Sequence, residues 1–208
     1  RRRVAVVGDI DAKTLGPLLG RTFGGLAAKG PEPDKTPAPA ERPAGLKVIK
    51  QDIPQTVILF GGAGLLRSDP DFIPAYVMNY VLGGGGFASR LMKQVREKRG
   101  LAYNVSTSLV PNDLAGVLVG YVATENSRAA QSLNLIKTEF ARMRDDGVTE
   151  AELADAKTYL TGAYPLRFDS NDDIADELLG IQMENLGIDY IDKRNGLIRA
   201  VTRDDIKR

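Results

Sequence analysis

The sequence contains no cysteine and no histidine among its 208 residues. Without cysteine the chain has no disulfide, no thiolate metal site and no cysteine nucleophile. Without histidine it lacks the commonest metal ligand and the commonest general base at neutral pH. A zinc site built only from aspartate and glutamate would be unusual. If the chain takes part in hydrolysis, we therefore expect another domain or subunit to hold the metal.

The chain also has no large net charge of either sign and no long apolar run. The chain has 28 basic and 27 acidic residues, so its net charge gives no reason to expect nucleic acid as a partner. No segment approaches the roughly 18 to 20 consecutive apolar residues that cross a bilayer, and no membrane span is predicted. The first residue is Arg1 rather than methionine. We therefore expect a piece of a longer precursor, whose upstream part could carry an export signal.

Composition divides the chain into three parts. Residues 1–29 predict a strand followed by a helix that Asp9 or Asp11 could cap, and we interpret this unit as the counterpart of the end of a preceding domain. Residues 30–45 hold five of the eleven prolines, which is typical of an extended linker. Residues 46–208 are expected to form a C-terminal domain that is truncated at its end.

The order of patterns in this C-terminal part predicts an α+β fold, with a largely antiparallel sheet packed against helices. Two strands are expected at 46–51 and 55–64, the second so apolar that it predicts a central strand buried on both faces. Residues 101–111 alternate and should form a hairpin with 115–124. Helices are predicted at 126–145, 149–164, 171–186 and 189–200, with Thr149 and Thr202 as N-caps.

A run of four glycines separates two further predicted helices in "LGGGGFASRLMKQVREKRGLAY", residues 82–103. The second helix should bury Phe87, Leu91 and Val95 on one face. A nucleotide loop would need a Lys-Ser/Thr pair or a preceding strand, and neither is present. A turn between helices explains one or two glycines but hardly four. A loop that lets a substrate backbone come close explains the run better, so the candidate substrate-binding residues are Gly83, Gly84, Gly85 and Gly86.

Basic residues follow the glycines, and most of them are typical of a solvated helix face near its C-terminus. Arg96 and Tyr103 differ, because one ends a helix, the other opens a strand, and Gly100 turns the chain between them. A guanidinium and a phenol side by side can donate hydrogen bonds to a peptide carbonyl, or to the oxyanion formed when a carbonyl is attacked. Neither group can activate water by itself. Chance neighbours on an ordinary surface remain the alternative.

Pairs of acidic residues could also indicate general acid–base chemistry. The two pairs, Asp172-Asp173 and Asp204-Asp205, both lie where a helix is predicted to begin. Acidic side chains at that position accept hydrogen bonds from free backbone N–H groups and complement the helix dipole. We therefore interpret both pairs as helix caps.

The segment "LGGGGFASRLMKQVREKRGLAYNVSTS" resembles a motif in the C-terminal half of the pitrilysin/insulinase family of zinc metallopeptidases, which includes the mitochondrial processing peptidases. The segments "VAVVGDIDAKTLGPLLGRTFGGL" and "GVTEAELADAKTYLTGAY" are similar to the family as well. The resemblance implies the α+β fold of the processing-peptidase-like metallohydrolases, in which several such domains enclose a peptide chamber. One half of these enzymes carries the zinc motif H-x-x-E-H. The opposing half contributes an Arg and a Tyr seven residues apart.

The family pattern places these two roles on Arg96 and Tyr103 and links the glycine loop to peptide recognition. A chain without histidine cannot supply H-x-x-E-H, so it resembles only the non-zinc half, with no cofactor of its own and zinc in a partner. The resemblance thus implies an inactive domain, not an enzyme by itself, that assists a zinc metalloendopeptidase. A scaffold domain without any catalytic contribution is the alternative.

The partners implied by the resemblance are a zinc-bearing domain or subunit of the same family and a peptide substrate. The zinc-bearing part could lie in the same polypeptide, or in a second chain that forms a homodimer or heterodimer. For location, the family's occurrence in the bacterial periplasm and the absence of cysteine favour export, with the cytoplasm as the alternative.

Overall fold

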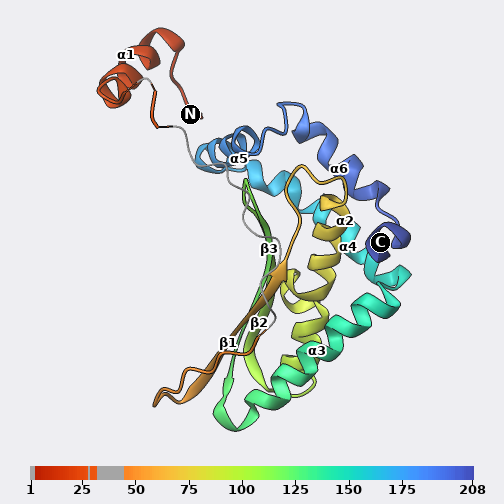
Figure 1. Ribbon diagram of the computed structural model, residues 1–208. Helices are drawn as coiled ribbons and strands as arrows, with labels where there is room; N and C mark the ends of the chain where they lie inside the picture. Colours follow the sequence, from red (N-terminus) through yellow and green to blue (C-terminus); the bar gives the residue numbers. More distant parts are fainter. Residues whose placement is uncertain (1–2, 28, 32–44) are drawn as a thin grey trace. The chain divides into compact units, whose positions relative to one another are not determined.

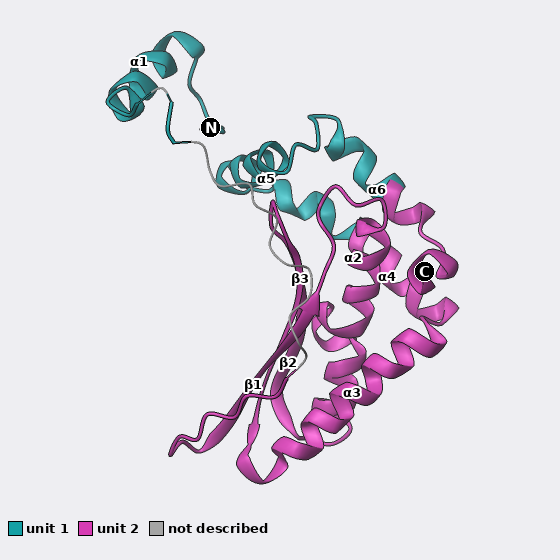
Figure 2. Ribbon diagram, in the orientation of Figure 1, with its two compact units in different colours: residues 1–35, 161–196 teal, residues 36–160, 197–208 magenta. Residues whose placement is uncertain are grey.

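The computed structural model describes residues 3–27, 29–31 and 45–208 (Figure 1). It consists of two compact units (Figure 2): residues 1–35 with 161–196, and residues 36–160 with 197–208. The predicted proline-rich linker, 30–45, lies almost entirely outside the described residues. The division of the chain into a preceding unit, a linker and a C-terminal domain stays a prediction.

The first unit contains helices that begin at polar caps. Helix α1 (Ala12–Phe23) starts after Asp11, whose side chain accepts a hydrogen bond from the Thr14 backbone N–H at 2.7 Å. Helix α5 (Asn171–Met183) starts after Ser170, which accepts from the Asp173 N–H at 3.1 Å. A short 3₁₀ helix, η5 (Tyr164–Phe168), precedes α5, and α6 (Tyr190–Ala200) follows it, with its residues from 197 onward belonging to the second unit.

The strand expected at the start of the chain is wrong for the residues described there. Residues 3–7 are extended but belong to no strand. A strand is defined by ladder hydrogen bonds to a neighbouring strand, and apolar alternation alone does not provide one. The described part of the chain pairs no segment with these residues.

The second unit is built on a three-stranded antiparallel sheet in the order β1-β3-β2. Its strands are β1 (Gln55–Ala63), β2 (Ala102–Pro111) and β3 (Gly116–Glu125). The predicted hairpin is confirmed, since β2 and β3 pair from Val105 opposite Val122 to Pro111 opposite Gly116. The α+β class with an antiparallel sheet is confirmed as well.

The prediction of a central position for residues 55–64 is wrong, because β1 lies at the edge of the described sheet and β3 is central. Val57 and Leu59 are 51% and 77% exposed, whereas Ile58 and Phe60 pack against the core. The helices of this unit cover only one face of the sheet (Figure 1). The strand expected at 46–51 is absent, and those residues are irregular.

The helices of the second unit lie on the side of that covered face (Figure 1). They are α2 (Phe72–Asn79), η1 (Tyr80–Gly84), η2 (Gly86–Ala88), η3 (Met92–Glu97), η4 (Asn126–Arg128), α3 (Ala129–Asp146), α4 (Glu150–Gly162) and α7 (Arg203–Lys207). The core between helices and sheet includes Val77, Leu82, Leu91, Val95, Val105, Val122 and Ile198. Burial of each such side chain contributes on the order of 1.5–3 kcal/mol.

Both predicted threonine caps are confirmed. Thr202 and Asp205 form a reciprocal capping box at the start of α7. Thr149 makes the same exchange with Glu152 before α4: the Thr149 N–H donates to Glu152 Oε2 at 2.8 Å, and the Glu152 N–H donates to Thr149 Oγ1 at 3.2 Å. These bonds satisfy N–H groups that a helix start would otherwise leave unpaired.

Candidate functional site

The four glycines connect a π-helix to a 3₁₀ turn, which differs from the simple helix end expected from the sequence. Helix α2 continues into the π-helical segment η1, so Gly83 and Gly84 lie inside it. The 3₁₀ helix η2 then begins at Gly86. A second π-helical segment, η3, follows and carries Arg96. π-Helical turns are rare and occur frequently at functional sites. Two of them beside one loop therefore favour this region as a candidate functional site.

Three of the glycines have close neighbours within the chain. A Cβ atom at Gly83 would lie 2.9 Å from the Thr107 backbone nitrogen, and one at Gly84 would lie 2.6 Å from Asn79 Nδ2. A Cβ at Gly85 would lie 2.6 Å from the Tyr80 carbonyl oxygen. Larger residues at these three positions would therefore collide with neighbouring atoms of the second unit. This packing explains three of the four glycines, and the sequence alone did not reveal it.

Gly86 differs from the other three glycines. Its φ of +55° lies in the left-handed region, and no atom comes within 4 Å of where a Cβ would stand. Its carbonyl accepts a hydrogen bond from the hydroxyl of the buried Ser89 at 2.7 Å. The open space at Gly86 is the place on the loop where another backbone could come close.

Arg96 and Tyr103 lie together, as the sequence predicted. The Arg96 Cζ is 4.5 Å from the centroid of the Tyr103 ring. Gly100, with a φ of +59°, ends the helix between them. Its N–H donates to the Arg96 carbonyl at 2.8 Å, and the Leu101 N–H donates to the Val95 carbonyl at 2.9 Å. This turn returns the chain directly from the helix to β2.

The orientation of Tyr103 depends on an irregularity that simple alternation does not show. Strict alternation would place Tyr103 on the same face as Val105, yet Tyr103 is 81% exposed and Val105 is fully buried. The register of β2 against β3 shifts between Ala102 and Val105. Such a bulge redirects side chains near the end of a strand. Here it leaves the phenol of Tyr103 in solvent beside Arg96.

The polar groups of this pair have no partners among the described residues. No hydrogen bond or ion pair within the described ranges involves the Arg96 guanidinium or the Tyr103 hydroxyl. Arg96 instead contacts a second ring, because its Cζ lies 4.5 Å from the centroid of Phe87. A guanidinium that stacks on rings through its face keeps the N–H donors at its edge available. The pair can therefore donate to a carbonyl oxygen or an oxyanion.

The predicted burial of Phe87 with Leu91 and Val95 is wrong. Phe87 is 58% exposed, while the other two are fully buried. The regular helix begins only at Arg90, because Ser89 has an extended backbone with ψ of 153°. Phe87 belongs to the preceding 3₁₀ turn and is not one of the buried core side chains.

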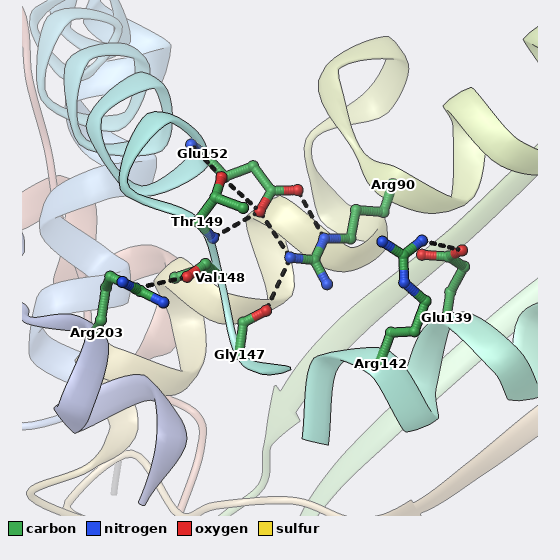
Figure 3. Close-up of polar contacts among 8 residues, drawn as sticks. All are labelled: Arg90, Glu139, Arg142, Gly147, Val148, Thr149, Glu152 and Arg203. Atoms are coloured by element: carbon green, nitrogen blue, oxygen red, sulfur yellow. Dashed lines mark hydrogen bonds and ion pairs between the residues drawn. The ribbon is translucent and has the colours of Figure 1, made fainter. Parts of the chain in front are cut away.

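Sequence reasoning missed the ion pair that anchors this region. Arg90 and Glu152 form a bidentate pair (Figure 3), with Nε to Oε1 at 2.7 Å and Nη2 to Oε2 at 2.6 Å. Arg90 Nη2 also donates to the Gly147 carbonyl at 2.8 Å. The hydrogen bonds from Arg90 lower the pKa of Glu152 to about 2, and those to Glu152 raise the pKa of Arg90. The pair ties the start of the Arg96-bearing helix to the start of α4.

A second acidic side chain lies near this pair (Figure 3). Glu139, on α3, is buried and accepts from Arg142 Nη1 at 3.1 Å. Its negative charge also raises the pKa of Arg90. Within the described chain, Arg90 Nη1 and Glu139 Oε2 are buried without hydrogen-bond partners. The pKa of Arg90 therefore depends on the charges of both Glu152 and Glu139.

The described residues do not fit a metal site of their own. Within the described ranges there is no cluster of three or more His, Cys, Asp or Glu side chains that could hold a metal ion. The two acidic pairs that were considered for chemistry lie in the first turns of α5 and α7, where the Asp173 side chain accepts from the Ser170 hydroxyl and Asp205 completes the capping box of Thr202. No helix in the described part of the chain is both long enough and apolar enough to cross a membrane.

The structure defines an α+β domain in which the half-buried Arg96 and the exposed Tyr103 lie beside a glycine loop, without a metal site among its described residues. Residues 2–160 match the model of the peptidase M16 inactive domain. This match covers most of the chain, which therefore belongs to that family. The resemblance to the non-zinc, C-terminal half of the pitrilysin/insulinase metallopeptidases is confirmed.

Named relatives differ in how they are described. An uncharacterized zinc protease of Mycobacterium leprae is 34% identical over 175 residues, which are 82% of this chain and 39% of that protein. A non-peptidase homolog of Helicobacter pylori is 37% identical over 122 residues, 58% of this chain and 28% of that protein. The chain thus spans well under half of either relative.

Solved structures show the same fold. The peptidase M16 inactive domain from Pseudomonas fluorescens matches with a TM-score of 0.67 and 34% identity, over 74% of this chain and 36% of that chain. A protease from Helicobacter pylori matches with a TM-score of 0.82 over 97% of this chain and 49% of that chain. At 17% identity, the second likeness concerns the fold alone.

Proposed function

We propose that this domain is the non-catalytic half of a zinc metalloendopeptidase, forms part of its peptide chamber, and supplies Arg96 and Tyr103 to the bound substrate. Zinc would be held by another domain or subunit that carries H-x-x-E-H. No step of the zinc chemistry belongs to this chain, whose own contribution is to bind and orient the peptide backbone.

The observation that carries this proposal is the availability of the two donors. The Arg96 guanidinium has no hydrogen-bond or ion-pair partner among the described residues, and its Cζ lies 4.5 Å from the centroid of the Tyr103 ring. An unpaired guanidinium next to an exposed phenol presents several N–H donors and one O–H donor to the same space. Donors held in place before the reaction stabilise a developing oxyanion more than mobile ones do.

The glycine loop would contribute by admitting the substrate backbone. Gly86 has open space around its missing side chain and lies one residue before Phe87, which contacts Arg96. A peptide that passes Gly86 would bring its carbonyl groups toward the Arg96 donors. In this proposal Gly83 to Gly85 act through the packing of the loop and Gly86 through its open surface.

The test is peptide hydrolysis by the complete protein, or by this chain assembled with its zinc-bearing partner. We expect Arg96→Ala and Tyr103→Phe each to lower kcat by about 10- to 1000-fold, where loss of a full oxyanion donor corresponds to the upper part of this range, about 100- to 1000-fold. Arg99→Ala is the matched control, because among the described residues the Arg99 guanidinium hydrogen-bonds only to Gln94, on its own segment. Turnover that is unchanged in both site variants, with zinc still bound, would refute the catalytic contribution.

A scaffold without catalytic contribution is the second candidate. It is favoured by one observation: a relative that shares 37% identity over 122 residues is described as a non-peptidase homolog. In that case Arg96→Ala should leave the turnover of the assembled protein unchanged, while variants that unfold the domain should abolish assembly. Measuring assembly and turnover on the same samples separates the two candidates.

A further inference from the structure

Phe87 is an exposed aromatic side chain next to the Arg–Tyr pair. Its ring is 58% exposed, so burial in the core does not account for it. The Arg96 Cζ lies 4.5 Å from the centroid of this ring and 4.5 Å from that of Tyr103. Of the ring contacts among described residues, none joins Phe87 to Tyr103. Both rings therefore contact the Arg96 guanidinium, and they do not contact each other.

The backbone holds Phe87 in this place. It lies in the 3₁₀ turn η2, between Gly86 with its φ of +55° and the buried Ser89. The Ser89 hydroxyl donates to the Gly86 carbonyl at 2.7 Å and accepts from the Met92 N–H at 3.4 Å. One buried hydroxyl thus connects both ends of the turn to the helix that carries Arg96.

Contact with two rings restricts a side chain that is otherwise flexible. A free arginine samples many rotamers, and it must give up this freedom when it binds a fixed carbonyl. The two ring contacts restrain the guanidinium before the substrate arrives, and no hydrogen bond among the described residues occupies its N–H groups. A group that is ordered in advance loses less entropy on binding.

We propose that Phe87 is a positioning residue, which orients the Arg96 guanidinium so that its N–H donors face the substrate carbonyl. This role rests on the proposed function of Arg96 and deepens it. The ring acts through Arg96, and no bond to the substrate is required of it. The chemical requirement at position 87 is an aromatic face, because an aliphatic side chain has no quadrupole to attract a cation.

The experiment compares Phe87→Ala, Phe87→Leu and Phe87→Trp in the complete zinc-bearing protein, with kcat and KM for a peptide measured separately. We expect Phe87→Ala and Phe87→Leu to lower kcat/KM by about 3- to 30-fold, the range that a lost cation–π contact implies. Phe87→Trp should retain activity near that of the parent. In an Arg96→Ala background, Phe87→Ala should cause no further loss.

The outcomes separate this role from the proposed function. If Arg96→Ala leaves turnover unchanged, the positioning role fails, and if Tyr103→Phe leaves it unchanged as well, the proposed function fails too. If Arg96→Ala lowers turnover and Phe87→Ala lowers it further by the same factor in both backgrounds, only the positioning role is overturned. Full activity of Phe87→Leu would overturn it too.

A second measurement covers variants that change the fold rather than the site. The ring-current shift of the Arg96 Nε–H resonance should decrease in Phe87→Leu to the part that Tyr103 contributes, and it should persist in Phe87→Trp, with an unchanged melting temperature in both. An Arg96 resonance that does not respond to either change would show that the ring does not hold the guanidinium, and would overturn the inference.

Discussion

The Arg90–Glu152 ion pair is the clearest point at which the structure can be tested by a single change. The two side chains are 11% and 28% exposed and come from segments 62 residues apart in the sequence. The perturbation is Glu152→Gln, which removes the charge but keeps an oxygen that can accept from the Thr149 N–H. The variant therefore tests the ion pair while retaining an acceptor for the helix cap.

The magnitude follows from the burial of the pair. Loss of one partner costs about 3–5 kcal/mol when both charges are fully buried, and about 0–1 kcal/mol when both are exposed. Arg90 is nearly buried and Glu152 is partly screened by solvent, so we expect a loss of about 2–3 kcal/mol in the free energy of unfolding. For a chain of this size that corresponds to a melting temperature lower by about 4–12 °C.

Urea unfolding at neutral pH measures the change, and Arg90→Met with the double variant completes a cycle that isolates the pair. The control is Asp145→Asn, because the Arg144–Asp145 pair is 75% and 58% exposed and should contribute little. If Glu152→Gln moves the unfolding midpoint no more than Asp145→Asn does, the assigned role of the pair is refuted.

The same pair predicts a dependence of stability on acid. The pKa of Glu152 falls from the ordinary 4.5 to about 2 in the folded chain, mainly through the hydrogen bonds from Arg90. A carboxyl whose pKa is lower in the folded state contributes stability that is complete above pH 4.5 and is lost as the pH falls toward 2. Glu152→Gln should therefore flatten the decline of stability between these pH values, and an unchanged acid profile would contradict the pKa assignment.

Two further predictions concern the packing of the second unit, and urea unfolding tests both. Gly83→Ala should destabilise the chain by about 1–3 kcal/mol because its Cβ would meet Thr107, whereas Gly162→Ala, with open space around it, should have no such cost; equal midpoints for both would contradict the described packing. Leu59→Ser should change stability by no more than about 0.5 kcal/mol, because Leu59 is 77% exposed, whereas Leu82→Ala should cost about 2–5 kcal/mol. A large loss for Leu59→Ser would show that its face of β1 is covered.

Local patterns in the sequence predicted the local structure well. Alternation predicted the β2–β3 hairpin, and threonine followed three residues later by an acid predicted the caps at Thr149 and Thr202. The Arg96–Tyr103 contact was also predictable, because Gly100 reverses the chain over a few residues. In each case the interacting groups are close in sequence, so the backbone geometry of a few residues decides the outcome.

Errors arose where a pattern fits two environments equally well. The apolar run in β1 is compatible with a central strand or with an edge strand that exposes one side, and only the strand order distinguishes them. Phe87 had the spacing of a buried helical residue, but the backbone becomes helical only after Ser89. Strict alternation would place Tyr103 on the same face as the buried Val105, and a bulge between Ala102 and Val105 separates the two.

The sequence by itself determined the α+β class, the family, and the absence of cysteine and histidine, because these depend on composition and on motifs that are continuous along the chain. Only the tertiary structure decided that Arg90 pairs with Glu152 and that the Arg96 guanidinium contacts two rings while its hydrogen-bond donors stay free. The physical reason is that these contacts depend on how helices and strands pack in space. A residue's partner across a core is set by that packing, and spacing along the chain does not encode it.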